Sequence, residues 1–99
     1  MSFDIKYPAE IVPLTFPYTR ELNGATISLG SPVVSVTVVR GADPNSAQML
    51  SGAAQISGGL VLQSIINGLP ECDYHFVCQA DLSDGRRLIR SGTLSVKSP

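Results

Sequence analysis

The sequence predicts an all-β fold, an antiparallel β-sandwich of about seven strands that resembles an immunoglobulin or fibronectin III domain. Three observations lead to this fold class. Apolar side chains recur at every second position, for example over residues 74–82, and this alternation is typical of antiparallel strands with one buried face. Turn residues such as Asn23-Gly24 and Asp84-Gly85 separate the alternating runs at short intervals. The 99 residues are enough for one domain of this kind.

The runs between the turns have the length of strands. The predicted strands comprise residues 12–18, 25–29, 33–40, 53–57, 60–66, 73–82 and 86–96. We expect the first strand at the edge of a sheet, because Pro13 and Pro17 cannot donate an amide proton to a neighbouring strand. The tightest hairpins are expected at Gly58-Gly59 and Asp84-Gly85.

Some segments allow more than one interpretation. Residues 43–50 are predicted as a loop, and one helical turn after Pro44 is the alternative. The run 60–66 leaves open which side faces the core, because apolar residues occupy both of its parities. Tyr74 follows the corner at Leu69-Pro70, and we expect its hydroxyl to bond to backbone upstream, as in a tyrosine corner.

The chain divides into an N-terminal arm of residues 1–11 and a single sandwich domain of residues 12–99. Along the arm, apolar residues such as Phe3, Ile5 and Tyr7 alternate with charged ones. A segment of this kind either packs along its own sandwich or adds as a strand to a neighbouring copy or another protein.

Charge and hydropathy exclude several classes of protein. Seven basic and eight acidic residues leave a net charge of −1, whereas a domain that binds nucleic acid usually has a marked positive excess. No apolar run approaches the ~18 residues of a membrane span, so we expect no membrane association. The first residues lack the apolar core of a secretory signal, which predicts a cytoplasmic protein.

Cys72, His75 and Cys78 form the one cluster with the residue types of a metal site. On a strand, His75 points away from both cysteines, and these lie ~20 Å apart, too far for a disulfide. We therefore expect no metal and no disulfide, with Cys78 buried and His75 on the outer face. No nucleophile motif or phosphate-binding loop is present in the sequence. The chain is predicted to be non-enzymatic and to have no cofactor.

Arg86, Arg87 and Arg90 form the one basic cluster. Arginines on a last strand commonly keep a sheet edge soluble or pair with nearby carboxylates, here those of Asp81 and Asp84. The alternative is that they surround a protein interface, where arginine is enriched. The two aspartates offset the positive charge, which argues against a nucleic-acid site.

Several stretches follow one another in a characteristic order. They are Tyr7-Pro8-Ala9-Glu10 with Leu14-Thr15-Phe16, Leu22-Asn23-Gly24-Ala25-Thr26-Ile27, Gly59-Leu60-Val61-Leu62-Gln63, and Tyr74-His75-Phe76-Val77-Cys78-Gln79-Ala80 before Ser83-Asp84-Gly85-Arg86. In order and spacing these stretches resemble a family of small proteins of tailed phages and prophages, the immunoglobulin-like fiber–tail adaptor or virion-associated proteins. One departure is Pro70-Glu71-Cys72-Asp73, where small residues and glycine are expected.

The resemblance implies a structural or assembly protein of a phage or prophage, made in the host bacterial cytoplasm and then part of the virion. Its partners would be phage structural proteins of the tail, fiber or head–tail connector, with a homo-oligomer left open. We expect binding through sheet edges and loops. The candidate interface residues are Ile5 and Tyr7 on the arm and Arg87, Ile89 and Ser91 on the last strand.

The alternative function is a carbohydrate- or receptor-binding module, because sandwiches host many kinds of site. Such a module needs exposed aromatic side chains. The chain has no Trp, 3 Phe and 3 Tyr, and most of these have the parity of the core.

Overall fold

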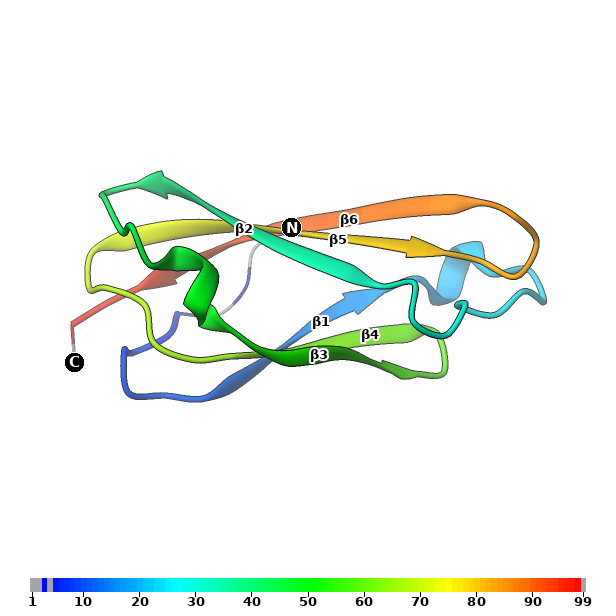
Figure 1. The fold of residues 1–99 in the computed structure, drawn as a ribbon, viewed down its shortest axis with the longest axis horizontal. Helices are drawn as coiled ribbons and strands as arrows, with labels where there is room; N and C mark the ends of the chain where they lie inside the picture. The colour runs from blue at the N-terminus through cyan, green and yellow to red at the C-terminus, as the bar shows by residue number, and fades with distance from the viewer. Residues whose placement is uncertain (1–2, 4, 99) are drawn as a thin grey trace.

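The computed structural model describes residue 3 and residues 5–98. Two antiparallel three-stranded sheets pack face to face, which confirms the predicted all-β sandwich (Figure 1). Its strands are β1 (Val12–Pro17), β2 (Val33–Arg40), β3 (Leu50–Ser57), β4 (Leu60–Ile65), β5 (Cys72–Asp81) and β6 (Arg87–Val96). Two short 3-10 helices, η1 (Thr19–Glu21) and η2 (Ser46–Met49), follow β1 and precede β3. The strand order is β1-β4-β3 in one sheet and β2-β5-β6 in the other.

The described residues form six strands, so the prediction of seven was wrong. The segment 25–29 is not a strand, and Ile27 makes only an isolated bridge to Leu82. Positive-φ residues stand on both sides of it, at Gly24 (φ 87°) and Gly30 (φ 77°). The short segment between these two turns therefore crosses past the end of β5 toward the other sheet. It does not run alongside β5 for long enough to pair with it as a strand.

The segment 43–50 is not the loop that we predicted. It contains η2, the helical turn after Pro44 that was the alternative, and the first residue of β3. Asp43 starts the turn, since its side-chain Oδ1 accepts a hydrogen bond from the Asn45 amide at 2.9 Å. Met49 closes it with a side chain that is only 1% exposed. The buried methionine holds the helical turn against the core. This is a tertiary contact, and local helix propensity does not include it.

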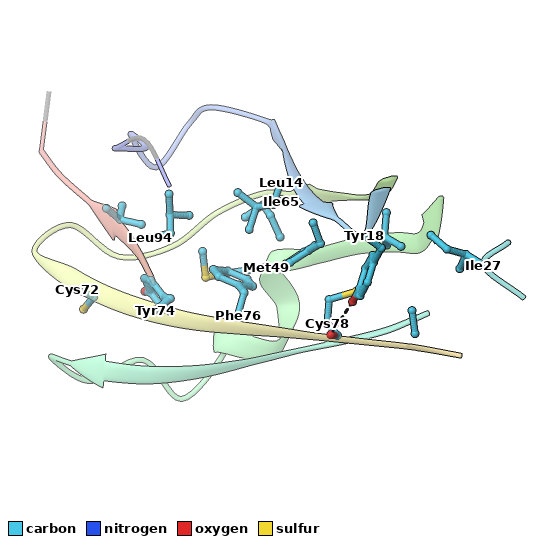
Figure 2. Packing of buried hydrophobic residues seen from close by; sticks show 14 of the residues in the cluster. Leu14, Tyr18, Ile27, Met49, Ile65, Cys72, Tyr74, Phe76, Cys78 and Leu94 are labelled. Carbon is cyan, nitrogen blue, oxygen red and sulfur yellow. Dashed lines mark hydrogen bonds between the residues drawn. The ribbon is translucent and has the colours of Figure 1, made fainter. Parts of the chain in front are cut away.

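The core lies between the sheets and takes alternate residues from the strands (Figure 2). Its largest buried side chains are Tyr18, Tyr74, Phe16, Phe76, Met49, Ile65, Leu94, Val61 and Val96. In β4 the inward residues are Val61, Gln63 and Ile65, which settles the facing that the sequence left open. The buried Gln63 amide donates to the carbonyls of Ser51 and Gly52, at 3.4 and 3.2 Å, beside the irregularity in β3.

Two buried tyrosines bond to backbone. Tyr74 accepts a hydrogen bond from the Leu69 amide at 2.8 Å and donates to Asp43 Oδ2 at 2.8 Å. The expected bond from this hydroxyl to backbone upstream is therefore confirmed. Tyr18 donates to the Cys78 carbonyl at 2.9 Å and so joins the end of β1 to β5 of the opposite sheet (Figure 2). Burial raises the pKa of both tyrosines, which keeps the hydroxyls protonated as donors.

Candidate functional site

The sandwich has four edge strands, and three of them carry features that hinder pairing with another chain. β1 is an edge strand, as predicted, and has Pro13 and Pro17. β3 has a register shift between Ser51 and Gln55, and β2 has one beyond Val38. By contrast, β6 pairs with β5 over ten residues without a shift. Among the described strands, β6 is thus the regular edge.

The backbone of β6 alternates between two neighbours. Its even residues bond toward β5, because the carbonyls of Arg86 and Val96 accept the amides of Leu82 and Glu71. Its odd residues bond the other way, because the carbonyls of Thr93 and Ser95 accept amides of the arm. The parity is unbroken along the strand, so the N–H and C=O groups of residues 87, 89 and 91 point toward the open edge.

The arm covers only one end of this edge. Phe3 donates its amide to the Thr93 carbonyl at 3.0 Å, and Lys6 pairs in parallel with Val96. Phe3 also packs edge-on against Phe16, with ring centroids 5.6 Å apart. The described part of the arm therefore packs along its own sandwich, the first of the two alternatives. Its described residues bond to residues 93–97, and no other described strand lies beside residues 87–91.

Lys6 anchors the arm, and the sequence did not predict this. The residue is 1% exposed, and its ammonium donates to the carbonyls of Tyr7, Pro8 and Asn67 at 3.0, 3.1 and 2.6 Å. Burial lowers the pKa of Lys6, while the nearby Glu10 carboxylate opposes that shift. The alternation of the arm places Lys6 on the polar side. The sequence carries no signal for its burial, because the acceptor that completes the site is the backbone carbonyl of Asn67.

The five candidate interface residues fall into two groups. Ile89 is 55% exposed, and Arg87 and Ser91 lie beside it on the outward parity of β6. Ile5 and Tyr7 are 60% and 43% exposed on the arm. Because Lys6 pairs with Val96, the arm group lies about 23 Å along β6 from Ile89 at ~3.3 Å per residue. The structure exposes both groups but does not join them in one patch.

Arg86 and Arg87 pair locally, as the first interpretation proposed, whereas Arg90 pairs with Glu21 of η1. Arg87 bonds to Asp81 at 2.7 Å, Arg86 to Asp84 at 2.8 Å, and Arg90 to Glu21 at 2.8 Å. The hydrogen bond from Arg87 lowers the pKa of Asp81, so this pair stays ionised near neutral pH.

Arg90 also connects the two sheets across the open side. Its guanidinium lies 5.1 Å from the centroid of the Tyr18 ring. It donates to the carbonyls of Pro17 at 3.2 Å and Ile89 at 2.9 Å. Arg90 thus occupies one lone pair of the Ile89 carbonyl.

The cysteine–histidine cluster has the arrangement expected for structural residues. Cys72 and Cys78 are buried free thiols, and burial raises the pKa of Cys78, which disfavours a reactive thiolate. His75 lies on the outer face, 3.4 Å from Thr93 Oγ1. Across residues 3 and 5–98, no group of three or more His, Cys, Asp or Glu side chains could hold a metal ion. The same residues contain no helix with the length and apolarity needed to cross a membrane.

No protein family matches this sequence, and no curated protein matches it either. The function is therefore inferred from the geometry of the β6 edge and from the resemblance to the phage proteins.

Proposed function

We propose that this protein is a non-enzymatic structural or assembly protein of a phage or prophage, which binds other virion proteins through its sheet edges and loops. It is made in the host cytoplasm and then becomes part of the particle. The order of motifs along the chain supports the phage assignment. Its binding partners are tail, fiber or head–tail connector proteins.

The observation that carries the binding role is the open part of β6. An edge with regular, unpaired N–H and C=O groups is a template for another strand, and proteins usually protect such edges. Here three edges carry prolines or register shifts, while residues 87–91 of β6 do not. Ile89 lies in the middle of that stretch and is 55% exposed. Addition of a strand at such an edge is a common mode of protein recognition.

The alternative, a carbohydrate- or receptor-binding module, has less support. Stacking on a sugar requires exposed aromatic rings. Of the six aromatic residues, Tyr7 is the exposed one, at 43%, and Phe3 is half-buried. Binding on a glycan array that depends on Tyr7 would favour this alternative over the phage role.

Photo-cross-linking in phage-producing cells tests the proposed function. A photoreactive amino acid is placed at Tyr7 or at Ile89, with exposed Gln48 of η2 as the control position. We expect the chain to sediment with purified particles or assembly intermediates. We also expect a cross-link from position 7 or 89, but not from 48, to a different virion protein. A chain that is absent from particles and intermediates, and that cross-links to no virion protein, would contradict the proposal.

A further inference from the structure

We propose that Asn67 is a self-modification site, at which the Lys6 ammonium promotes loss of the side-chain amide and formation of an isoaspartate linkage. The reactants are this chain and water. The inference concerns the anchor of the arm and is independent of the proposed function.

Asn67 and Gly68 form a turn between β4 and β5 in which both residues have a positive φ, 59° and 97°. The Asn67 side chain is exposed to water. A Cβ atom at position 68 would lie 3.0 Å from the Val96 side chain, so glycine fits there and holds this peptide close to the core. Glycine also leaves its amide nitrogen free of a neighbouring Cβ, which allows a small ring to close on that nitrogen.

The Lys6 ammonium bonds to the carbonyl of the same peptide unit. Its distance to the Asn67 oxygen is 2.6 Å, the shortest of its three bonds to carbonyls. To act as a nucleophile, the Gly68 amide must lose its proton, and negative charge then spreads to the Asn67 carbonyl oxygen. A cation already placed at that oxygen stabilises the charge where it develops. Among the described residues, the Gly68 amide donates to no acceptor that would hold it back.

The reaction has two steps and involves no oxidation or reduction. In the first, the Gly68 nitrogen attacks Cγ of Asn67, the Cγ–Nδ2 bond breaks, and the amide proton leaves with the side-chain nitrogen as ammonia. The product is a cyclic imide with two carbonyl groups. In the second step, water adds to one of them and the Gly68 nitrogen recovers a proton. Lys6 polarises the former main-chain carbonyl, so water adds there and the chain then continues through Cγ as isoaspartate.

The product gives the buried ammonium a carboxylate partner. Lys6 is 1% exposed and its three acceptors are neutral carbonyls. A buried charge is costly unless it is paired. In isoaspartate the former carbonyl of residue 67 is a carboxylate, at the position where Lys6 now donates. The modified chain should therefore hold its arm more firmly than the newly made chain.

The sequence contains an internal control in Asn23-Gly24. This second Asn-Gly pair is also exposed, and its φ values of 47° and 87° are close to those of the first pair. Among the described residues, no charged side chain bonds to the Asn23 carbonyl. The two sites thus share their residue types and their backbone conformation, and they differ in the cation.

Peptide mapping by mass spectrometry of the aged full chain tests the proposal. Trypsin separates the two sites, because Arg40 lies between them. We expect Asn67 to lose its amide about tenfold faster than Asn23, the factor that ~1.4 kcal/mol of transition-state stabilisation supplies. Isoaspartate, identified by electron-transfer fragmentation, should predominate at position 67.

Two variants and a denatured sample separate the cation from the turn. Lys6→Met should lower the rate at Asn67 to that at Asn23. Lys97→Met, which removes a half-exposed ammonium, should leave both rates unchanged. In urea the unmodified chain should lose its amides at similar rates at the two sites, because the bond from Lys6 to Asn67 is then broken.

Limited chymotryptic cleavage after Phe3 measures the effect on the arm. The aged chain should be cleaved more slowly than the fresh chain. Asn67→Gly keeps the carbonyl and the turn but has no side-chain amide, so ageing should not change its cleavage.

The proposal would be overturned by equal rates at the two sites in the folded chain, by a Lys6→Met variant whose rate at Asn67 is unchanged, or by an aged arm that is cleaved faster. None of these results bears on association with virion proteins. Conversely, a chain that never associates with particles would contradict the phage role and leave the modification intact.

Discussion

At the scale of single residues, hydroxyl groups join the interior of the sandwich to its backbone. Tyr74 satisfies two partners, the Leu69 amide and the Asp43 carboxylate, each at 2.8 Å. Tyr18 satisfies one, the Cys78 carbonyl at 2.9 Å. Because a buried polar group without a partner is costly, the number of partners sets how much each hydroxyl stabilises the fold.

Tyr74→Phe should lower the free energy of unfolding by about 2–3 kcal/mol, since it removes the partner of the Leu69 amide and of Asp43 Oδ2. Tyr18→Phe, which removes a single bond, should cost about 1 kcal/mol. Urea denaturation monitored by far-ultraviolet circular dichroism measures both values. Equal losses of unfolding free energy for the two variants would contradict the view that the Tyr74 hydroxyl links the loop before β5 to Asp43.

The sequence was informative about these residues to different degrees. Tyr74 was predicted because a tyrosine just after a proline corner has a recognisable local context. Lys6 was not predicted, because its burial depends on the carbonyl of Asn67, 61 positions away in the chain. Distant backbone acceptors leave no periodic signal in the sequence.

At the scale of elements, the arm depends on the buried ammonium of Lys6. Lys6→Met keeps the apolar stem but leaves three carbonyls without their donor. We expect a loss of about 1–3 kcal/mol in the free energy of unfolding and faster chymotryptic cleavage after Phe3 of the arm. Lys97→Met is the control, since Lys97 Nζ is 3.8 Å from Glu71 in a half-exposed pair, and it should change stability by less than about 0.5 kcal/mol. An arm equally resistant to cleavage in both variants would contradict the anchoring role.

The strands were largely predictable, and the two failures have physical causes. Strands with one buried face keep a period of two, as β5 does from Cys72 to Asp81. The segment 25–29 has the composition of a strand, but it crosses between the sheets and pairs with Leu82 through a single bridge at Ile27. The turn η2 depends on burial of Met49 in the core, a tertiary contact that local propensity does not contain.

At the scale of the whole molecule, ion pairs near the ends of the β2-β5-β6 sheet make the stability of the fold depend on pH in the acid range. Hydrogen bonds from Arg40 and Arg87 lower the pKa of Asp73 and Asp81, and one from the Arg86 amide lowers that of Asp84. A carboxylate with a lowered pKa stabilises the fold fully above its unfolded value near 3.8 and loses that contribution as the pH falls through its folded value.

The urea concentration at the midpoint of unfolding should therefore decrease as the pH is lowered from about 5 to about 3. Replacing the three aspartates with asparagine should flatten this decrease, and high salt should reduce it because the pairs are exposed. The measurement compares both proteins at constant ionic strength. A triple variant with an unchanged pH dependence would show that other carboxyl groups are responsible.

The candidate site was predictable in part. Arg87, Ile89 and Ser91 share one parity of a last strand, so their common face follows from the sequence. Their open backbone does not, because it depends on which part of β6 bonds to the described residues of the arm. Nor could the separation of Ile5 and Tyr7 from Ile89 be deduced, since the parallel register of the arm is a tertiary property.

Residue-resolved hydrogen exchange tests most directly the claim that residues 87–91 of β6 form an open edge. We expect fast exchange for the amides of Arg87, Ile89 and Ser91 and slow exchange for those of Leu88 and Arg90, which bond to β5. Protection of Ile89 equal to that of its even neighbours would contradict the claim.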